Sequence, residues 1–350
     1  MKKILFTGGG SAGHVIPNIA LMEELLKSGN VDVGYMGTDG IEKEIITGQK
    51  IPYYQIECPK LIRGGGFHGL KRNLKIPFAF SRAVKNAKTG LNAFQPDLVF
   101  SKGGYVALPV VFAARKLNIP CFAHESDFSA GLSNRLSARK CERVFTSFPE
   151  TAEKIPHGKY SGPPIRASIL SAHRAKARQQ LNIPFSDKVL LVFGGGSGSA
   201  AINDAVRKNL KTLTEKYTIL HVCGKGNVLQ SNVKNYIQTE FVTDMGAAYA
   251  AADLVLARAG AGTVFEILAT KKPSLLVPLS GQTRGDQKQN ADYFKRRGLC
   301  RVLPQNRLHE LPKAIDEAFE DKRMVSNLYE TRFAEGNENI LREIKKRLGI

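Results

Sequence analysis

Residues 4–14 read ILFTGGGSAGH, so a short apolar run passes directly into a glycine-rich turn and then into a segment suited to a helix. The same passage recurs as VLLVFGGGSGS at residues 189–199. A buried strand that ends in a glycine turn and opens a helix places backbone N–H groups next to a bound anion, at the positive end of the helix dipole. Two such turns predict an α/β protein with two Rossmann-like domains, whose parallel sheets face each other across a cleft.

The composition fits two ordinary globular domains. The chain has 350 residues, 43% of them hydrophobic, which is enough for two domains of roughly 150 residues. Its net charge of +20 favours an anionic partner, such as a polyanion, an anionic lipid or a phosphorylated substrate. Five scattered cysteines predict reduced thiols in a cytosolic protein. Without a signal peptide or a stretch near the roughly 20 apolar residues of a membrane span, any membrane contact is expected to be peripheral.

Strand and helix signals alternate along the chain, as in a parallel sheet covered on both faces. Strands are expected at residues 4–7, 31–36, 97–100, 119–123, 144–146, 189–193, 218–222, 254–256 and 274–277. Helices are expected at residues 17–27, 109–116 and 337–348. The Pro- and Gly-rich segment 156–164 predicts a boundary. The expected parts are a first domain at 1–160, a second at 161–335, and a helix at 336–350 that packs back on the first.

The first glycine turn alone is a weak signal for a dinucleotide site. Gly8, Gly10 and Gly13 satisfy the pattern G-x-G-x-x-G. The acid that holds the ribose is missing at the end of the second strand, which reads YMGT at residues 35–38. His14 follows the turn directly, where a neutral imidazole can serve as a general base or position a hydroxyl. The alternative is a histidine that only caps the helix or fills space.

A basic stretch at residues 61–90 contains no acid and interleaves Lys and Arg with Leu, Ile and Phe. Such a segment can lie on an anionic bilayer, each basic residue adding about 1 kcal/mol near the surface. A solvated helix face and a nucleic-acid surface are the other interpretations. No nucleic-acid-binding motif accompanies the stretch, so no nucleic-acid partner is expected.

Two segments of the second half suit a nucleotide sugar. Residues 257–266 read ARAGAGTVFE, in which small residues let a ligand approach the backbone and Thr263 can cap a helix. Glu266, one turn further on, can accept two hydrogen bonds from a ribose diol. Residues 284–291 read RGDQKQNA and can present amides to sugar hydroxyls. A helix cap with a surface acid and a polar turn is the alternative for either segment alone.

Seven ordered motifs, which span nearly the whole chain, resemble the MurG family of bacterial UDP-N-acetylglucosamine transferases. They are GGSAGHVIP at 9–17, KGGYV at 102–106, HESD at 124–127, AGLSN at 130–134, PIR at 164–166, RAGAGTVFE at 258–266, and DQ with NA within 286–291. The resemblance implies a GT-B fold. It also implies conversion of lipid I to lipid II in peptidoglycan synthesis, by transfer of GlcNAc to the 4-hydroxyl of MurNAc with inversion.

The resemblance implies that the second domain holds most of UDP-GlcNAc. The implied donor residues are Ala261, Gly262, Thr263, Val264, Phe265 and Glu266 (on the ribose), with Val242 beside uracil, Arg166 near the diphosphate and Gln287 on the sugar hydroxyls. From the other side of the cleft the donor is expected to meet Ser11, Ala12 and Gly13. The acceptor side comprises His14, Tyr105, Glu125 and Asn134, with His14 as first choice for the catalytic base and Glu125 as second.

Two positions depart from the family pattern. Asp127 stands where the family usually has Asn, which adds a negative charge near a diphosphate. Gly196 stands where the second glycine turn usually has Ser, and Ser197 can take over that hydroxyl's role. Both residues are still expected to contact the donor.

The expected partners are UDP-GlcNAc, undecaprenyl-pyrophosphoryl-MurNAc-pentapeptide and, through residues 61–90, the cytoplasmic face of the cell membrane. No cofactor or metal is expected, because the sequence lacks a D-x-D acid pair and a His cluster. The alternatives are another GT-B transferase with a different lipid acceptor such as diacylglycerol, a sugar-nucleotide epimerase, and a non-catalytic binding protein.

Overall fold

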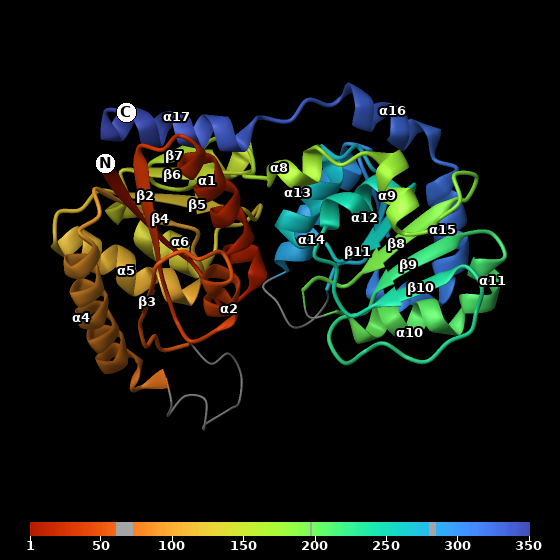
Figure 1. The fold of residues 1–350 in the computed structure, drawn as a ribbon, viewed down its shortest axis with the longest axis horizontal. Helices are drawn as coiled ribbons and strands as arrows, with labels where there is room; N and C mark the ends of the chain where they lie inside the picture. The colour runs from red at the N-terminus through yellow and green to blue at the C-terminus, as the bar shows by residue number, and fades with distance from the viewer. Residues whose placement is uncertain (61–72, 197, 280–284) are drawn as a thin grey trace. The chain divides into compact units, whose positions relative to one another are not determined.

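The computed structural model describes residues 1–60, 73–196, 198–279 and 285–350. Over these residues the chain forms two compact units, one of Met1–Arg166 with Ala334–Ile350 and one of Ala167–Phe333 (Figure 1). The described part of each unit contains one parallel sheet. The first unit therefore contains both ends of the chain, and the second is inserted between them.

The first sheet has seven strands in the described residues, in the order β3-β2-β1-β4-β5-β6-β7. Their bounds are β1 Lys2–Thr7, β2 Val31–Gly37, β3 Tyr53–Gln55, β4 Leu98–Ser101, β5 Cys121–Glu125, β6 Arg143–Thr146 and β7 Gly158–Tyr160. Alternate residues of β1 enter two separate cores: Ile4 and Phe6 lie in one, and Leu5 lies in the other. The central strands are thus buried on both faces, which is why they are continuous apolar runs.

Helices cover both faces of this sheet. Their bounds are η1 Ala12–His14, α1 Ile16–Lys27, α2 Ile41–Thr47, α4 Ile76–Phe94, α5 Gly104–Lys116, α6 Leu132–Ser137, η2 Ala138–Lys140, α7 Pro149–Lys154 and α17 Gly336–Leu348. The C-terminal helix α17 packs beside α1 (Figure 1) and adds Ile340, Ile344 and Leu348 to the core of the first unit. No helix of the described residues is both long and apolar enough to cross a membrane.

In the second unit the described sheet has six strands in the order β10-β9-β8-β11-β12-β13. Their bounds are β8 Val189–Phe193, β9 Thr218–Val222, β10 Tyr236–Thr239, β11 Leu254–Ala257, β12 Ser274–Leu276 and β13 Arg301–Val302. The helices are α8 Ala167–Leu170, α9 Arg174–Gln180, α10 Ala200–Lys208, α11 Leu210–Thr214, α12 Met245–Ala251, α13 Ala261–Ala269, α14 Asp286–Arg296, η3 Gln305–Glu310, α15 Leu311–Phe319 and α16 Lys322–Glu330.

Two sequence predictions differ from the structure. The helix expected at 109–116 begins at Gly104, because the left-handed φ angles of Gly103 (87°) and Gly104 (80°) turn the chain into α5 before Pro109. The segment 156–164 contains β7, which pairs in parallel with β6. The first unit consequently ends at Arg166 rather than at residue 160.

Candidate active site

Each sheet brings two loops together where its strand order reverses. In the first unit β1 lies between β2 and β4, and in the second β8 lies between β9 and β11. Open α/β sheets bind ligands outside the carboxyl ends of the strands at such a point. In the first unit the segments 8–14 and 102–105 follow β1 and β4, and in the second unit 194–199 and 258–260 follow β8 and β11.

His14 lies where the two segments of the first unit meet. Its Nδ1 is 3.0 Å from the hydroxyl of Ser11. A Cβ at Gly104 would lie 3.3 Å from this Nδ1 and would collide with the carbonyl oxygen of Gly9. The ring of Tyr105 lies against the first loop, because a Cβ at Gly10 would be only 2.7 Å from its Cε1. The structure thus brings His14 and Tyr105 to one place, as the sequence motifs predict.

Glu125, at the end of β5, is nearly buried, with 5% of its surface exposed. Its Oε1 accepts the backbone N–H of Asp127 (2.9 Å), and its Oε2 accepts the N–H of Gly131 (2.8 Å) and the side-chain amide of Asn134 (2.9 Å). Burial, and then the charge of Asp127, raise the pKa of the Glu125 carboxyl above its usual value. Both carboxyl oxygens therefore hold the loop that follows β5.

Lys102 is a buried cation beneath the same loop. Its side chain is 2% exposed, and its Nζ donates to the hydroxyl of Ser126 at 2.6 Å. Burial lowers the pKa of Lys102 to about 8, while the charges of Glu125 and Asp127 act in the opposite direction. The additional negative charge of Asp127 is therefore balanced by a cation of its own unit.

In the second unit Arg258 joins the ends of three neighbouring strands. One guanidinium nitrogen donates to the hydroxyl of Ser199 (2.8 Å) after β8, and the other to the carbonyl of Val277 (3.2 Å) after β12. Burial lowers the pKa of Arg258, which is 8% exposed. Ser199 also caps α10 by accepting the N–H of Ile202 at 3.4 Å. Arg258 thus joins the segments that follow β8 and β12 to the end of β11.

The residues expected to hold the donor lie at this same edge. Ala261, Gly262, Thr263, Val264, Phe265 and Glu266 form the first turns of α13. The carboxylate of Glu266 accepts the hydroxyl of Tyr249 at 3.1 Å, which fixes its direction. Gln287, near the start of α14, accepts the N–H of Leu279 at 3.0 Å. Val242 is half-buried just after β10.

The glycines of the two units differ in what surrounds them. In the second unit, a Cβ at Gly195, Gly260, Gly262 or Gly285 would meet nothing within 4 Å. In the first unit, Cβ atoms at Gly8, Gly9 and Gly10 would lie 2.7, 2.6 and 2.7 Å from other atoms. Of the first turn, Gly13 has room: its nearest neighbour would be the Ser11 hydroxyl at 3.8 Å. These four glycines of the second unit therefore leave the backbone open to a ligand, although Gly194 and Gly198 of its glycine turn are packed against Ser199 and Cys223. Most of the first turn is already filled.

The remaining predicted residues are less defined by the structure. Arg166 is half-buried and is the last residue of the first unit before the chain enters the second, whereas the sequence predicts it in the second domain. Ser11, Ala12 and Gly13 are at least partly exposed. Gly196 is exposed, and Ser197 lies outside the described residues.

Comparison with known proteins identifies the family. Residues 4–146 match the model of the glycosyltransferase family 28 N-terminal domain, and residues 189–348 match that of the C-terminal domain. The chain belongs to glycosyltransferase family 28. The prediction that it is a hexose-transferring enzyme with two parallel α/β sheets in a GT-B fold is confirmed.

Two similar curated proteins carry the same name. A UDP-N-acetylglucosamine–N-acetylmuramyl-(pentapeptide) pyrophosphoryl-undecaprenol N-acetylglucosamine transferase of Clostridium botulinum is 41% identical over 356 residues, which is 99% of each chain. A protein of that name from Clostridium perfringens is 40% identical over 98% of each chain. The crystal structure of MurG from Acinetobacter baumannii is 28% identical and covers 99% of this chain and 100% of its own, with a TM-score of 0.75. The resemblance seen in the sequence is confirmed.

The structure describes the basic stretch predicted at residues 61–90 from residue 73 onward. Residues 61–72 lie outside the described residues. Ala83, Val84, Ala87 and Leu91 of α4 face the core. Leu74 and Phe78 are 69% and 81% exposed, and the basic side chains exposed around them are Lys75, Arg82 and Lys85. The described part of this segment therefore presents apolar and basic side chains together.

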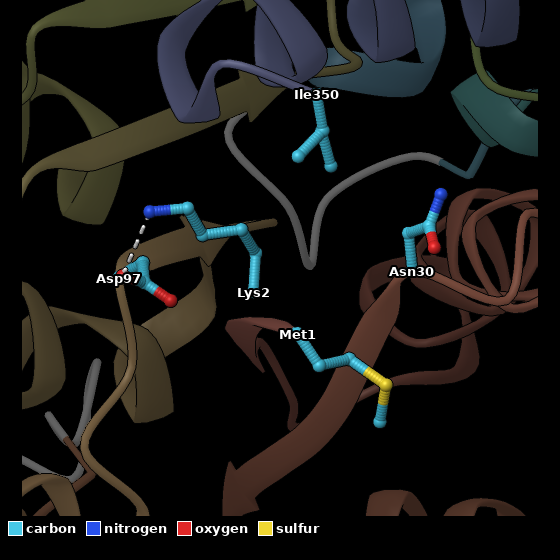
Figure 2. A pocket seen from close by; sticks show the side chains of 5 residues that line it. All are labelled: Met1, Lys2, Asn30, Asp97 and Ile350. Atoms are coloured by element: carbon cyan, nitrogen blue, oxygen red, sulfur yellow. Dashed lines mark ion pairs between the residues drawn. The ribbon is translucent and has the colours of Figure 1, made fainter.

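Figure 2 shows a hollow at the amino-terminal ends of the central strands of the first sheet. It is lined by Met1, Lys2, Asn30, Asp97 and Ile350. There the Lys2 ammonium is 3.6 Å from the Asp97 carboxylate. These residues lie at or just before the starts of β1, β2 and β4, and at the chain's C-terminus. The hollow therefore lies opposite the carboxyl ends of the strands and is not part of the candidate site.

The sequence alone did not predict an individual role for Lys102, Arg258 or Glu42. Lys102 and Arg258 were seen only as members of motifs, and nothing in a motif distinguishes a buried, hydrogen-bonded cation from an exposed one. Glu42 lies four residues beyond Thr38, where the ribose acid of a dinucleotide site was sought, and its carboxylate turns back toward the first glycine loop.

Proposed function

We propose that this family 28 chain catalyses the reaction for which its relatives are named. It transfers GlcNAc from UDP-GlcNAc to the MurNAc 4-hydroxyl of undecaprenyl-pyrophosphoryl-MurNAc-pentapeptide. The oxygen of that hydroxyl bonds to C1 of GlcNAc as the bond from C1 to the diphosphate breaks, so the configuration at C1 inverts and UDP leaves. The product is lipid II for peptidoglycan synthesis.

The open glycine backbone of the second unit is the observation that supports donor binding there. A diphosphate needs close access to backbone N–H groups, and Gly195, Gly260 and Gly262 provide it. Among the described residues no side chain caps the start of α13, unlike that of α10, so its first N–H groups can face the leaving diphosphate. Arg166 supplies positive charge to the same group, and Glu266 accepts hydrogen bonds from the ribose.

His14 is the proposed general base. Its imidazole takes the proton of the MurNAc 4-hydroxyl, and the Ser11 hydroxyl, 3.0 Å from Nδ1, helps to orient the ring. Tyr105 lies beside the same loop, and Asn134 is tied to the carboxylate of Glu125. Both residues are suited to lining the acceptor site, while Glu125 maintains the loop.

The exposed apolar and basic side chains of α4 and the turn before it are proposed to bind the anionic face of the membrane, where the undecaprenyl chain of the acceptor is anchored. Leu74 and Phe78 would enter the interface, and the basic side chains around them would meet lipid phosphates. The enzyme then works as a peripheral protein on the cytoplasmic side of the membrane.

The test is an acceptor comparison with purified enzyme and radiolabelled UDP-GlcNAc. We expect label in the lipid fraction with a short-chain lipid I analogue and none with diacylglycerol. Labelled product from diacylglycerol alone would replace the proposed acceptor with the alternative one. Release of UDP and free GlcNAc at the same rate with and without acceptor would contradict transferase activity on either lipid.

A further inference from the structure

A buried carboxylate occupies the first glycine loop. Glu42, in α2, has no exposed surface. Its Oε2 accepts the backbone N–H of Gly10 at 3.2 Å, and its Oε1 accepts the N–H of Thr38 at 3.0 Å and the Thr38 hydroxyl at 2.5 Å. Gly10 and Thr38 follow the neighbouring strands β1 and β2, so one carboxylate joins the ends of both.

Three glycines make room for this carboxylate. A Cβ at Gly9 would lie 2.6 Å from its Cδ, one at Gly40 would lie 2.9 Å from its Oε2, and one at Gly37 would lie 2.9 Å from the Cγ of Glu42. Any larger residue at these positions would displace the acid or the loop. The glycines of the first turn are thus explained at least in part by a side chain of the protein itself.

The position of Glu42 can be compared with the dinucleotide-binding site of a Rossmann fold. In a dinucleotide site the loop N–H groups bind phosphate, and an acid at the end of the second strand binds the ribose. Here an acid one turn beyond that strand reaches back to an N–H of the loop. A carboxylate of the protein thus accepts a loop N–H that a phosphate would otherwise bind.

We propose that Glu42 is a positioning residue, a built-in anion that closes the first glycine loop to phosphate and holds the segment carrying His14. Its link to His14 is short, since Ser11 follows Gly10 and its hydroxyl contacts Nδ1 of the imidazole. The effect of Glu42 on catalysis through His14 rests on the proposed function. Its effect on the conformation of the first glycine loop does not depend on that function.

The experiment uses the full chain with Glu42→Ala and Glu42→Gln, and Glu44→Gln as a control on the exposed face of the same helix. Amide hydrogen exchange of residues 8–14 is measured without substrate. We expect exchange about tenfold faster in E42A, the effect of losing a hydrogen bond to a charged group, a smaller increase in E42Q, and none in E44Q. Formate, a small carboxylate that fits the vacated space, should slow exchange in E42A only.

Kinetics then test the link to His14. In E42A, kcat should fall by about a hundredfold, as expected when a reacting group is misplaced, while KM for UDP-GlcNAc changes less than about twofold. Formate should restore part of kcat in E42A and none in H14A. The proposal would be overturned if amide exchange in E42A equalled that of wild type. It would also be overturned if formate changed neither the exchange nor the kcat of E42A.

If E42A does not fold, Thr38→Val provides the same test, because it removes the hydroxyl that donates to Glu42. Exchange of residues 8–14 should then be faster in T38V and normal in T38S, and wild-type exchange in T38V would overturn the proposal. If the chain proved not to transfer GlcNAc, exchange would still decide the role of Glu42 in the loop.

Discussion

At the scale of single residues, His14 bears the proposed chemistry. Replacing it with Ala removes the base but leaves the donor residues of the second unit intact. We expect kcat to fall by about 10²–10⁴-fold, with little change in KM for UDP-GlcNAc, in a steady-state transfer assay. His173→Ala, at an exposed histidine outside the site, is the control. Equal kcat in H14A and wild type would rule out His14 as the base.

A second residue, His221, makes the second unit sensitive to acid. It is fully buried, and its ring nitrogens contact the Tyr236 hydroxyl at 2.9 Å and Oδ1 of Asn203 at 3.0 Å. Burial, and then the charge of Arg207, lower the pKa of His221 to about 4 from its ordinary 6.5. The unfolded chain therefore binds this proton more readily, so stability is lost as pH falls from 6.5 to 4.

The shift predicts that His221 costs the second unit roughly 3 kcal/mol of unfolding free energy over that pH range. His221→Gln cannot be protonated, so its unfolding free energy should depend less on pH. Denaturant unfolding of wild type and variant at neutral and acidic pH measures the difference. The same pH dependence in both proteins would show that His221 is not the responsible group.

At the residue scale, the sequence was enough to identify the motifs. It was not enough to predict all the contacts that their side chains make. His14, Tyr105 and Glu266 were named because their types and places suit the chemistry, and the structure brings the first two together. Glu42 and Lys102 escaped because their importance comes from burial and from partners distant in sequence. A pattern of residue types does not carry that information.

At the scale of elements, α4 and the turn before it provide the proposed membrane contact. Replacing Phe78 and Leu74 with Ser removes the two exposed apolar side chains. We expect binding to phosphatidylglycerol vesicles to weaken by about tenfold or more, given roughly 1.5–3 kcal/mol for each large apolar side chain that is fully buried. Co-sedimentation measures it. The control is Tyr329→Ser, at a 71% exposed aromatic residue of α16, and equal binding by the F78S/L74S variant would remove α4 from the interface.

The elements that sequence predicts well are those buried on both faces. β8 and β9 match the expected ranges 189–193 and 218–222 because all five residues of each are buried. The edge strands β3, β7, β10 and β13 were not predicted, since they are short and only partly buried. Without an apolar run, only pairing with a neighbour distinguishes such segments from loops.

At the scale of the whole molecule, α17 makes the first unit depend on the far end of the chain. Ile344 is fully buried in the core of that unit, and Arg347 pairs with Glu142 at 2.7 Å. Ile344→Ala should destabilise the first unit by about 2–5 kcal/mol, whereas Lys345→Ala, on the exposed side, should have little effect. Amide exchange should accelerate in β1 and not in β8; acceleration in both, or in neither, would contradict this division.

The fold could be predicted because two glycine turns each follow an apolar strand, and the family because its motifs lie in order along the chain. Which turn receives the diphosphate could not be derived from the turns themselves, since both are glycine-rich. We propose that the diphosphate lies at the second unit, because Glu42 and Tyr105 fill most of the first turn, while Gly195 and, after β11, Gly260 and Gly262 leave open backbone. Gly194 and Gly198 of the second turn are themselves packed against Ser199 and Cys223.

Amide exchange of the full chain with and without UDP tests this assignment most directly. Bound UDP should slow exchange at residues 258–266 and 240–243, and leave residues 8–10 and 36–42, which the protein's own side chains fill, as they are without ligand. Slower exchange at residues 8–14 and 36–42, with none at 258–266, would place the nucleotide on the first unit and contradict the proposed donor site.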